Sequence, residues 1–275
     1  MEPIENVQGA QDSQGLRKLE QETWQPPSIA TPALPLFEYD TLPTSGIQKI
    51  RLIKILPHSD DSCPVEAELT THDVASAPHY TALSYTWGDV ATFPIVLNRR
   101  LAHVRSNLLS FMLGADPETL YWVDAICIDQ QNIPERSEVV SRMKNIYERA
   151  QGIVVWLGTV SPETASSFVA LDAFSNMHVF DLFKDRKRER YVPKDGEDAH
   201  TRPDLPVLKE RLLEHPYWHC IWILQEASTP IYHKGPYSST SVWYADRKHD
   251  FLNFLFGFLT LTNKRKERKE NIGIH

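Results

Sequence analysis

The chain has 275 residues, of which 41% are hydrophobic and 24% charged, a composition that supports a buried core and excludes a globally disordered protein. Its formal net charge of −7 at pH 7 argues against a nucleic-acid-binding protein, which would present a basic surface. The N-terminus is polar, and apolar runs stay shorter than the roughly 18–20 residues of a membrane helix, so we expect a cytoplasmic protein without an integral membrane segment. The three cysteines form no C-x-x-C pair, so we expect neither a disulfide framework nor a metal site.

The first third of the chain predicts a leader followed by strands. Residues 1–45 are polar and rich in proline, which is typical of an irregular leader. The stretch IQKIRLIKILP (47–57) predicts a strand, and the alternating VEAELT (65–70) predicts its hairpin partner. YTALSYTWGD (80–89) predicts a third strand that stops at a Gly-Asp turn, and FPIVLN (93–98) predicts a fourth.

The middle of the chain predicts a βαβ unit. VRSNLLSFMLG (104–114) is typical of a helix, and LYWVDAICI (120–128) is nearly continuous apolar sequence, typical of a strand covered on both faces. Asn132 and Glu135 have capping-box spacing, so a helix with one apolar face is expected to begin there. GIVVWLG (152–158) predicts a second buried strand, parallel to the first after a right-handed crossover.

The last part of the chain predicts less regular structure. A helix is expected over 161–177 and an exposed charged loop over 184–204. We expect one ordered domain over 46–230, followed by an irregular tail over 231–275. That tail contains a short apolar segment (251–262), expected to be a packing helix, and a basic end.

Four acids stand where α/β proteins keep their sites. In an open parallel sheet, ligands bind beyond the carboxyl ends of the strands. Asp89 follows the third strand, Asp124 and Asp129 lie within and just past the run 120–128, and Glu226 lies on a helix expected to begin near Pro216. Taken singly, Asp89 and Asp129 are also ordinary turn and loop acids.

Three segments together closely resemble the blocks of the fungal heterokaryon incompatibility (HET) domain. They are YTALSYTWGD (80–89), LYWVDAICIDQQNIPERSEVVSRMKNIYERAQGIVVWLG (120–158) and YWHCIWILQEAS (217–228). The chain departs from the family pattern at Cys220, where an arginine is usual, and at Asp129, where asparagine is common.

HET domains are distantly similar to TIR domains, and this likeness implies the fold and a catalytic residue. The implied fold is an α/β, TIR-like (flavodoxin-like) arrangement, with a central mostly parallel sheet flanked by helices and an N-terminal β-hairpin. In NAD-cleaving TIR domains, a Trp precedes the catalytic Glu by four residues on one helix face. Trp222 and Glu226 have that spacing, so the resemblance implies that Glu226 is the catalytic residue.

The chemistry of NAD+ cleavage suits such a set of residues. Breaking the bond between ribose and nicotinamide forms an oxocarbenium-like sugar, which a carboxylate can stabilise. The residues expected to bind the ligand are Tyr85, Trp87, Asp89, Asp124, Asp129 and Trp222. Aromatic rings at Tyr85 and Trp87 offer flat faces for stacking, although both could instead pack beneath the following helix, and Trp222 could be a core residue.

Three functions remain open on the sequence alone. The first is an NAD+-cleaving enzyme of fungal allorecognition and programmed cell death, with NAD+ as substrate and no cofactor. The second is a non-enzymatic signalling module that self-associates or binds other incompatibility proteins. The third is a hydrolase that holds Mg²⁺ between Asp124, Asp129 and Glu226, a spacing that nothing in the sequence requires.

Overall fold

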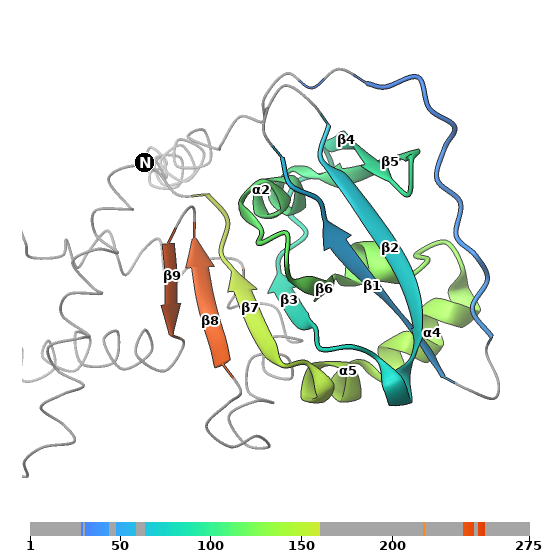
Figure 1. Ribbon diagram of the computed structural model, residues 1–275, viewed down its shortest axis with the longest axis vertical. Helices are drawn as coiled ribbons and strands as arrows, with labels where there is room; N and C mark the ends of the chain where they lie inside the picture. Colours follow the sequence, from blue (N-terminus) through green and yellow to red (C-terminus); the bar gives the residue numbers. More distant parts are fainter. Residues whose placement is uncertain are drawn as a thin grey trace, which may run out of the picture.

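The computed structural model describes residues 29, 31–43, 48–58, 64–159, 217, 239–244 and 247–250. The described strands form one mixed sheet in the order β5-β4-β2-β1-β6-β3-β7-β8-β9 (Figure 1). Their bounds are β1 Lys49–Ile55, β2 Glu66–Asp73, β3 Thr81–Tyr85, β4 Thr92–Leu97, β5 Arg100–Arg105, β6 Leu120–Trp122, β7 Gly152–Trp156, β8 Ser239–Tyr244 and β9 Arg247–Asp250. The helices are η1 Val74–Ser76, α2 Ser106–Gly114, α3 Asp124–Cys127, α4 Ile133–Ser141 and α5 Met143–Arg149.

The parallel part of the sheet lies in its middle. Strand β3 runs parallel to both β6 and β7, and β7 runs parallel to β8. The predicted βαβ unit is therefore present, but its two strands flank β3 instead of pairing with each other. The carboxyl ends of β3 and β7 lie together at the upper end of the sheet in Figure 1, beside α2.

The expectation of a mostly parallel sheet is wrong for the described strands. The pairs β2–β4, β3–β6, β3–β7 and β7–β8 are parallel, whereas β1–β2, β1–β6, β4–β5 and β8–β9 are antiparallel. The predicted β1–β2 hairpin is confirmed, and it joins the main sheet because Ile53 of β1 pairs with Tyr121 of β6. The architecture is thus α/β with a mixed sheet.

Strand β5 is an element that the sequence analysis did not predict. It forms a hairpin with β4 through Asn98 and Arg99, whose φ angles are 50° and 61°. Two successive residues with positive φ are the signature of the tight turns that connect antiparallel strands, and asparagine tolerates this conformation better than most residues. The helix predicted over 104–114 accordingly begins later, at Ser106.

The run 120–128 is not one strand, as predicted, but a short strand followed by a helical turn. Strand β6 ends at Trp122, and the carbonyl of Val123 accepts hydrogen bonds from the amides of Ile126 (3.0 Å) and Cys127 (2.7 Å). An apolar run of this length suits a buried strand and a buried helical turn equally well, because neither exposes a face to water. Ile126 and Cys127 are buried in the turn, as they would be in a strand.

The helix predicted to begin at Asn132 is confirmed at its start and interrupted further on. The side chain of Asn132 accepts a hydrogen bond from the amide of Glu135 at 3.2 Å, with Pro134 in the first turn. At Arg142, where φ is −105° and ψ is 0°, the helix breaks into α4 and α5.

Described segments of the leader and of the predicted tail both contact the sheet. Within 231–275, expected to be irregular, residues 239–244 and 247–250 are strands, so that expectation is wrong for them; Val242 and Tyr244 are fully buried. In the leader, the described residues 31–43 form no helix, and Leu36 makes a single bridge to Leu101 of β5. The predicted elements at 161–177, 184–204 and 251–262 lie outside the described residues. Within the described parts, every helix is too short or too polar to cross a membrane.

Candidate functional site

Three segments that leave the parallel strands meet at the carboxyl end of the sheet. The residues after β3 carry Trp87, the turn after β6 carries Asp124, and the residues after β7 include Gly158. This is the edge at which open α/β sheets bind their ligands. Side-chain hydrogen bonds connect these segments to one another and to α2.

The indole of Trp87 and the carboxyl of Asp124 form the central contact of this edge. Trp87 Nε1 donates to Asp124 Oδ2 at 2.8 Å, and the amide of Ala125 donates to Asp124 Oδ1 at 2.7 Å. Burial raises the pKa of Asp124 from 3.8 to about 6, and the hydrogen bonds from Trp87 and Ala125 act in the opposite direction. Two predicted ligand-binding residues are thus brought together, around an acid that is costly to ionise.

Asn107, in the first turn of α2, holds the same edge together and was missed by the sequence analysis. Its amide nitrogen donates to the carbonyl of Thr86 at 2.6 Å, while its Oδ1 accepts from Trp156 Nε1 at 2.9 Å. Gly88 and Gly158 both lie so close to the Asn107 side chain that a larger residue at either position would crowd it. A Cβ on Gly88 would lie 3.2 Å from Asn107 Cβ, and one on Gly158 would lie 3.2 Å from its Oδ1. The sequence feature that could have indicated Asn107 is a polar residue in the first turn of an otherwise apolar helix.

Arg105 is a second residue that sequence reasoning missed. Its guanidinium lies 5.2 Å from the ring centroid of Trp87, and its Nη1 donates to the carbonyl of Gly88 at 3.2 Å. Asp89, the next residue after Gly88, is exposed to solvent. The site edge therefore carries a cation stacked on the aromatic ring and an exposed acid beside it.

The other two candidates discussed here, Tyr85 and Asp129, have contacts that are typical of structural residues. Tyr85 is half-buried and packs against the hydrophobic core at the end of β3. Asp129 Oδ1 accepts from the amide of Gln131 at 3.1 Å, which is the local bond of a loop acid before a helix.

The third sequence block is attached to β3 at its first residue. The hydroxyls of Tyr217 and Ser84 are hydrogen-bonded at 2.8 Å, and both residues are buried. This contact places Tyr217 beside Ser84 of β3. Glu226, the predicted catalytic residue, and Trp222, predicted to bind the ligand, lie outside the described residues.

A second polar centre surrounds Arg51 of β1. Its Nη1 and Nη2 contact Glu135 Oε1 and Oε2 at 2.5 and 3.1 Å, and both side chains are only 2% exposed. Arg51 also donates to the carbonyls of Asp40 (2.7 Å) and Cys127 (3.2 Å). Glu135 Oε1 additionally accepts from the amide of Asp129 at 2.9 Å. Every oxygen of this buried acid is therefore paired.

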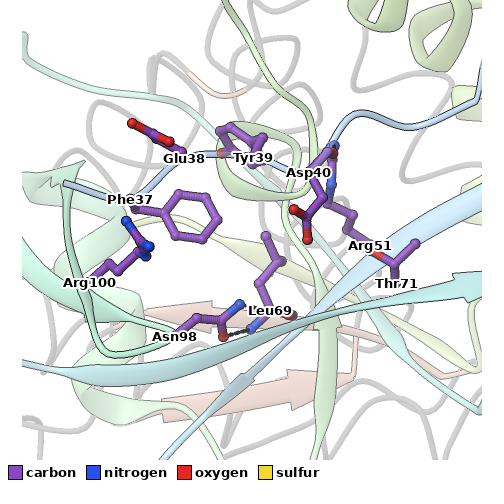
Figure 2. Close-up of a pocket in the computed structure, with 9 residues that line it drawn as sticks. All are labelled: Phe37, Glu38, Tyr39, Asp40, Arg51, Leu69, Thr71, Asn98 and Arg100. Atoms are coloured by element: carbon purple, nitrogen blue, oxygen red, sulfur yellow. Dashed lines mark hydrogen bonds between the residues drawn. The ribbon is translucent and has the colours of Figure 1, made fainter. Parts of the chain in front are cut away.

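Next to Arg51 is an open cavity of about 270 Å³, which does not contain the predicted site residues. It lies between the leader and the outer edge of β2, where the side chain of Asn98 bonds the amide (2.8 Å) and carbonyl (3.0 Å) of Leu69 in place of a neighbouring strand. Figure 2 shows its lining residues: Phe37, Glu38, Tyr39, Asp40, Arg51, Leu69, Thr71, Asn98 and Arg100. The candidate site at the carboxyl end of β3 is separate from it.

Within the described ranges, no group of three His, Cys, Asp or Glu side chains is placed to hold a metal ion. The thiol of Cys127 is buried and not in a disulfide, and burial raises its pKa to about 12.

Comparison with known proteins identifies relatives of this chain. A sequence model of the family described as heterokaryon incompatibility protein (HET) matches residues 80–226. Heterokaryon incompatibility protein 6, OR allele, of Neurospora crassa is 29% identical over 232 residues, which cover 76% of this chain and 31% of the relative. The chain thus spans about a third of the length of this relative. No solved structure matches the chain.

Proposed function

Because this chain belongs to the heterokaryon incompatibility family, we propose that it acts in fungal allorecognition, and that it triggers cell death by cleaving NAD+. The observation that carries the proposal is the hydrogen bond between Trp87 and Asp124. It joins the first and second family blocks at the ligand-binding edge of a parallel sheet, around a carboxyl whose pKa burial raises to about 6.

The third block completes the proposed site. Tyr217 is bonded to Ser84 on β3, and Glu226 follows nine residues later in the same block. We propose that Glu226 is the catalytic carboxylate and that Trp222 lies beside it. The family match ends at residue 226, so this acid belongs to the matched region.

The proposed reaction needs little acid catalysis. The bond between C1′ of the ribose and the nicotinamide nitrogen breaks, and its electron pair goes to the nitrogen, so nicotinamide leaves as a neutral molecule. The Glu226 carboxylate stabilises the oxocarbenium-like ribose, and a water molecule adds to C1′ and loses a proton. In this proposal Asp124, Asp89 and the Trp87 ring bind the dinucleotide.

A TIR-like fold goes with this proposal. The parallel order β6-β3-β7-β8, with the chain passing through helices between β6 and β7, supports it. We also propose that the protein acts in the cytoplasm. Self-association and binding of other incompatibility proteins are part of the same proposal, because a death signal must be held silent until a non-self partner is met.

The proposal is tested by nicotinamide release from the purified chain at high concentration, followed by chromatography. We expect Glu226→Gln to lower the rate by about 10²-fold or more, because the charge that stabilises the sugar cation is lost. Glu118→Gln is the matched control, since Glu118 is exposed and lies before β6, at the end opposite Asp124. Normal turnover by a folded Glu226→Gln variant would refute the catalytic assignment.

A second function is favoured by one observation at the same edge. The Trp87 ring already has Arg105 stacked on it, and its N–H is taken by Asp124, so these residues could simply stabilise an interaction surface. A non-enzymatic module would self-associate or bind partners without releasing nicotinamide. Light scattering across a concentration series, run on the same folded samples, separates this function from the enzymatic one.

A further inference from the structure

A smaller cavity of about 100 Å³ lies at the opposite end of the parallel strands from the candidate site. It is bounded by Tyr80, which precedes β3, and by α5, which precedes β7. Helix α5 is at the lower end of Figure 1. Ile50 and Ile146 contribute an apolar floor, while Arg142, Asn145 and Arg149 contribute polar groups. These three polar residues follow an i, i+3, i+7 spacing, which places them on one side of the helix.

Arg142 is held in this cavity by an unusual local structure. It stands at the break between α4 and α5, and its side chain is only 14% exposed. Its Nη2 lies 3.5 Å from Glu138 Oε1, but its Nε is buried and has no hydrogen-bond partner within the described part of the chain. A guanidinium that is so little exposed is poorly solvated, which favours an anion beside its other donors.

Arg149 brings a second guanidinium to the same cavity. Its Nη2 donates to the carbonyl of Val74 at 2.9 Å, which anchors the side chain across the cavity. A guanidinium carries five N–H donors, and Val74 takes one of those of Arg149 within the described part of the chain. The side chain is also exposed, which makes the cavity accessible from solvent.

We propose that this cavity binds the phosphate group of a small molecule. Arg142 and Arg149 both line the cavity, and their two guanidinium groups present forked donors that match the oxygens of phosphate. The volume suits a phosphate group and not a whole nucleotide, so the rest of a larger ligand would extend past Arg149 and Asn145 into solvent. The site is independent of the proposed NAD+ cleavage, because it lies at the other end of β3.

The test is thermal unfolding of the full chain in chloride buffer, with sodium phosphate added at constant ionic strength. We expect Tm to rise with phosphate and to saturate, as it does for a ligand that binds only the folded state. Arg142→Gln and Arg149→Gln should each weaken the apparent affinity at least about 10-fold, in line with loss of a charge-assisted contact. Lys144→Gln removes the same charge from α5 at a residue outside the cavity, and should leave the affinity unchanged.

Three results would overturn the proposal. The first is no saturating rise in the unmodified chain. The second is an equal rise in all three variants, which would show a general charge effect. The third is the same saturation with acetate, which would show a carboxylate site. Since Arg149 is exposed, Arg149→Gln keeps the test decisive even if Arg142→Gln does not fold. None of these readouts depends on NAD+ cleavage.

Discussion

Two acids of this molecule, the buried Glu135 and the half-buried Asp124, have opposite kinds of hydrogen-bond partners. Glu135 meets the guanidinium of Arg51 through two contacts and accepts a further bond from the amide of Asp129. Asp124 accepts only from neutral donors, Trp87 Nε1 and the Ala125 amide, and among the described residues no Lys or Arg forms an ion pair with it. Burial accordingly raises the pKa of Asp124.

The difference separates a structural polar centre from a candidate functional one. Arg51 and Glu135 connect the leader, β1, the α3 turn and α4, so their charges are fully occupied in holding elements together. Asp124 connects fewer elements and its ionised form is not compensated, which is the usual condition of an acid retained for binding or catalysis. Substitutions in the two centres should therefore differ in their effects on the free energy of unfolding and on its pH dependence.

The largest effect is expected at the Arg51–Glu135 pair. Arg51→Met leaves the Glu135 carboxylate buried and unpaired, and we expect a loss of about 3–5 kcal/mol in the free energy of unfolding. The double variant Arg51→Met/Glu135→Leu should be more stable than Arg51→Met, because no buried charge is left uncompensated. Urea unfolding monitored by circular dichroism measures both.

The matched control for this pair is the exposed ion pair of Lys144 with Glu148, whose atoms are 3.7 Å apart. Lys144→Gln should change stability by no more than about 0.5 kcal/mol, because helix surface pairs contribute little. If Arg51→Met costs as little as this control, Arg51 is not the buried centre that the contacts indicate.

At Asp124 we expect a pH-dependent effect of about 3 kcal/mol. The folded protein holds the proton up to a pH of about 6, whereas the unfolded chain releases it near 3.8. Stability contributed by the proton is therefore present below pH 4 and is lost as pH rises to 6, and a difference of about two pH units corresponds to about 3 kcal/mol. Asp124→Asn, which cannot ionise, escapes this loss.

The measurement is the difference in unfolding free energy between Asp124→Asn and the unmodified chain, from pH 4 to pH 7.5. We expect the difference to grow in favour of the variant up to about pH 6 and to stay level above it. Any hydrogen bond that asparagine fails to make adds a constant offset. A flat difference across this range would mean that Asp124 is ionised as easily as a surface acid.

A smaller effect tests how tightly the edge around Asp124 is built. Gly88 has a φ of +68°, and an added Cβ would meet Asn107, so Gly88→Ala should cost about 1–2 kcal/mol. Gly114 has open space around it, at the end of α2, and Gly114→Ala should be neutral or stabilising by up to about 1 kcal/mol. Equal costs at the two positions would contradict the close packing of Asn107 against Gly88.

Strong local patterns explain which parts of the fold could be predicted. The β1–β2 hairpin, β3, β4, β7 and the start of α4 each have alternating or continuous apolar residues with a clear boundary, such as the cap at Asn132. Strand β5 was missed because RLAHVR carries charges within it, although Asn98 marked the turn before it. The run 120–128 was misassigned because it is apolar at almost every position, so no period distinguishes its strand from its helical turn.

The candidate site was predictable in its composition and not in its contacts. Trp87 and Asp124 each follow a predicted strand or lie near its end. Because the carboxyl ends of parallel strands lie at one edge of the sheet, the sequence predicted both residues at that edge. Their hydrogen bond, and the role of Asn107 in fixing Thr86 and Trp156, depend on side chains meeting between β3, α2 and β7. Such meetings join residues tens of positions apart, which local patterns do not encode.

The smallest expected effect is also the most specific to the Trp87–Asp124 bond. Trp87→Phe keeps an aromatic ring and removes one donor, so we expect a loss of about 1 kcal/mol in stability. Because that donor favours the ionised carboxyl, its loss should raise the pKa of Asp124 further above 6, which carbon-detected NMR titration of the side chain measures. Trp243→Phe is the control, since it loses a hydrogen bond to Ser241 on β8 and should leave the titration of Asp124 unchanged. A raised pKa with nearly unchanged stability would mean that this bond tunes the acid more than it holds the fold. An unchanged titration would mean that the indole and the carboxyl are not bonded in solution, and the edge would then lose the contact on which its functional assignment rests.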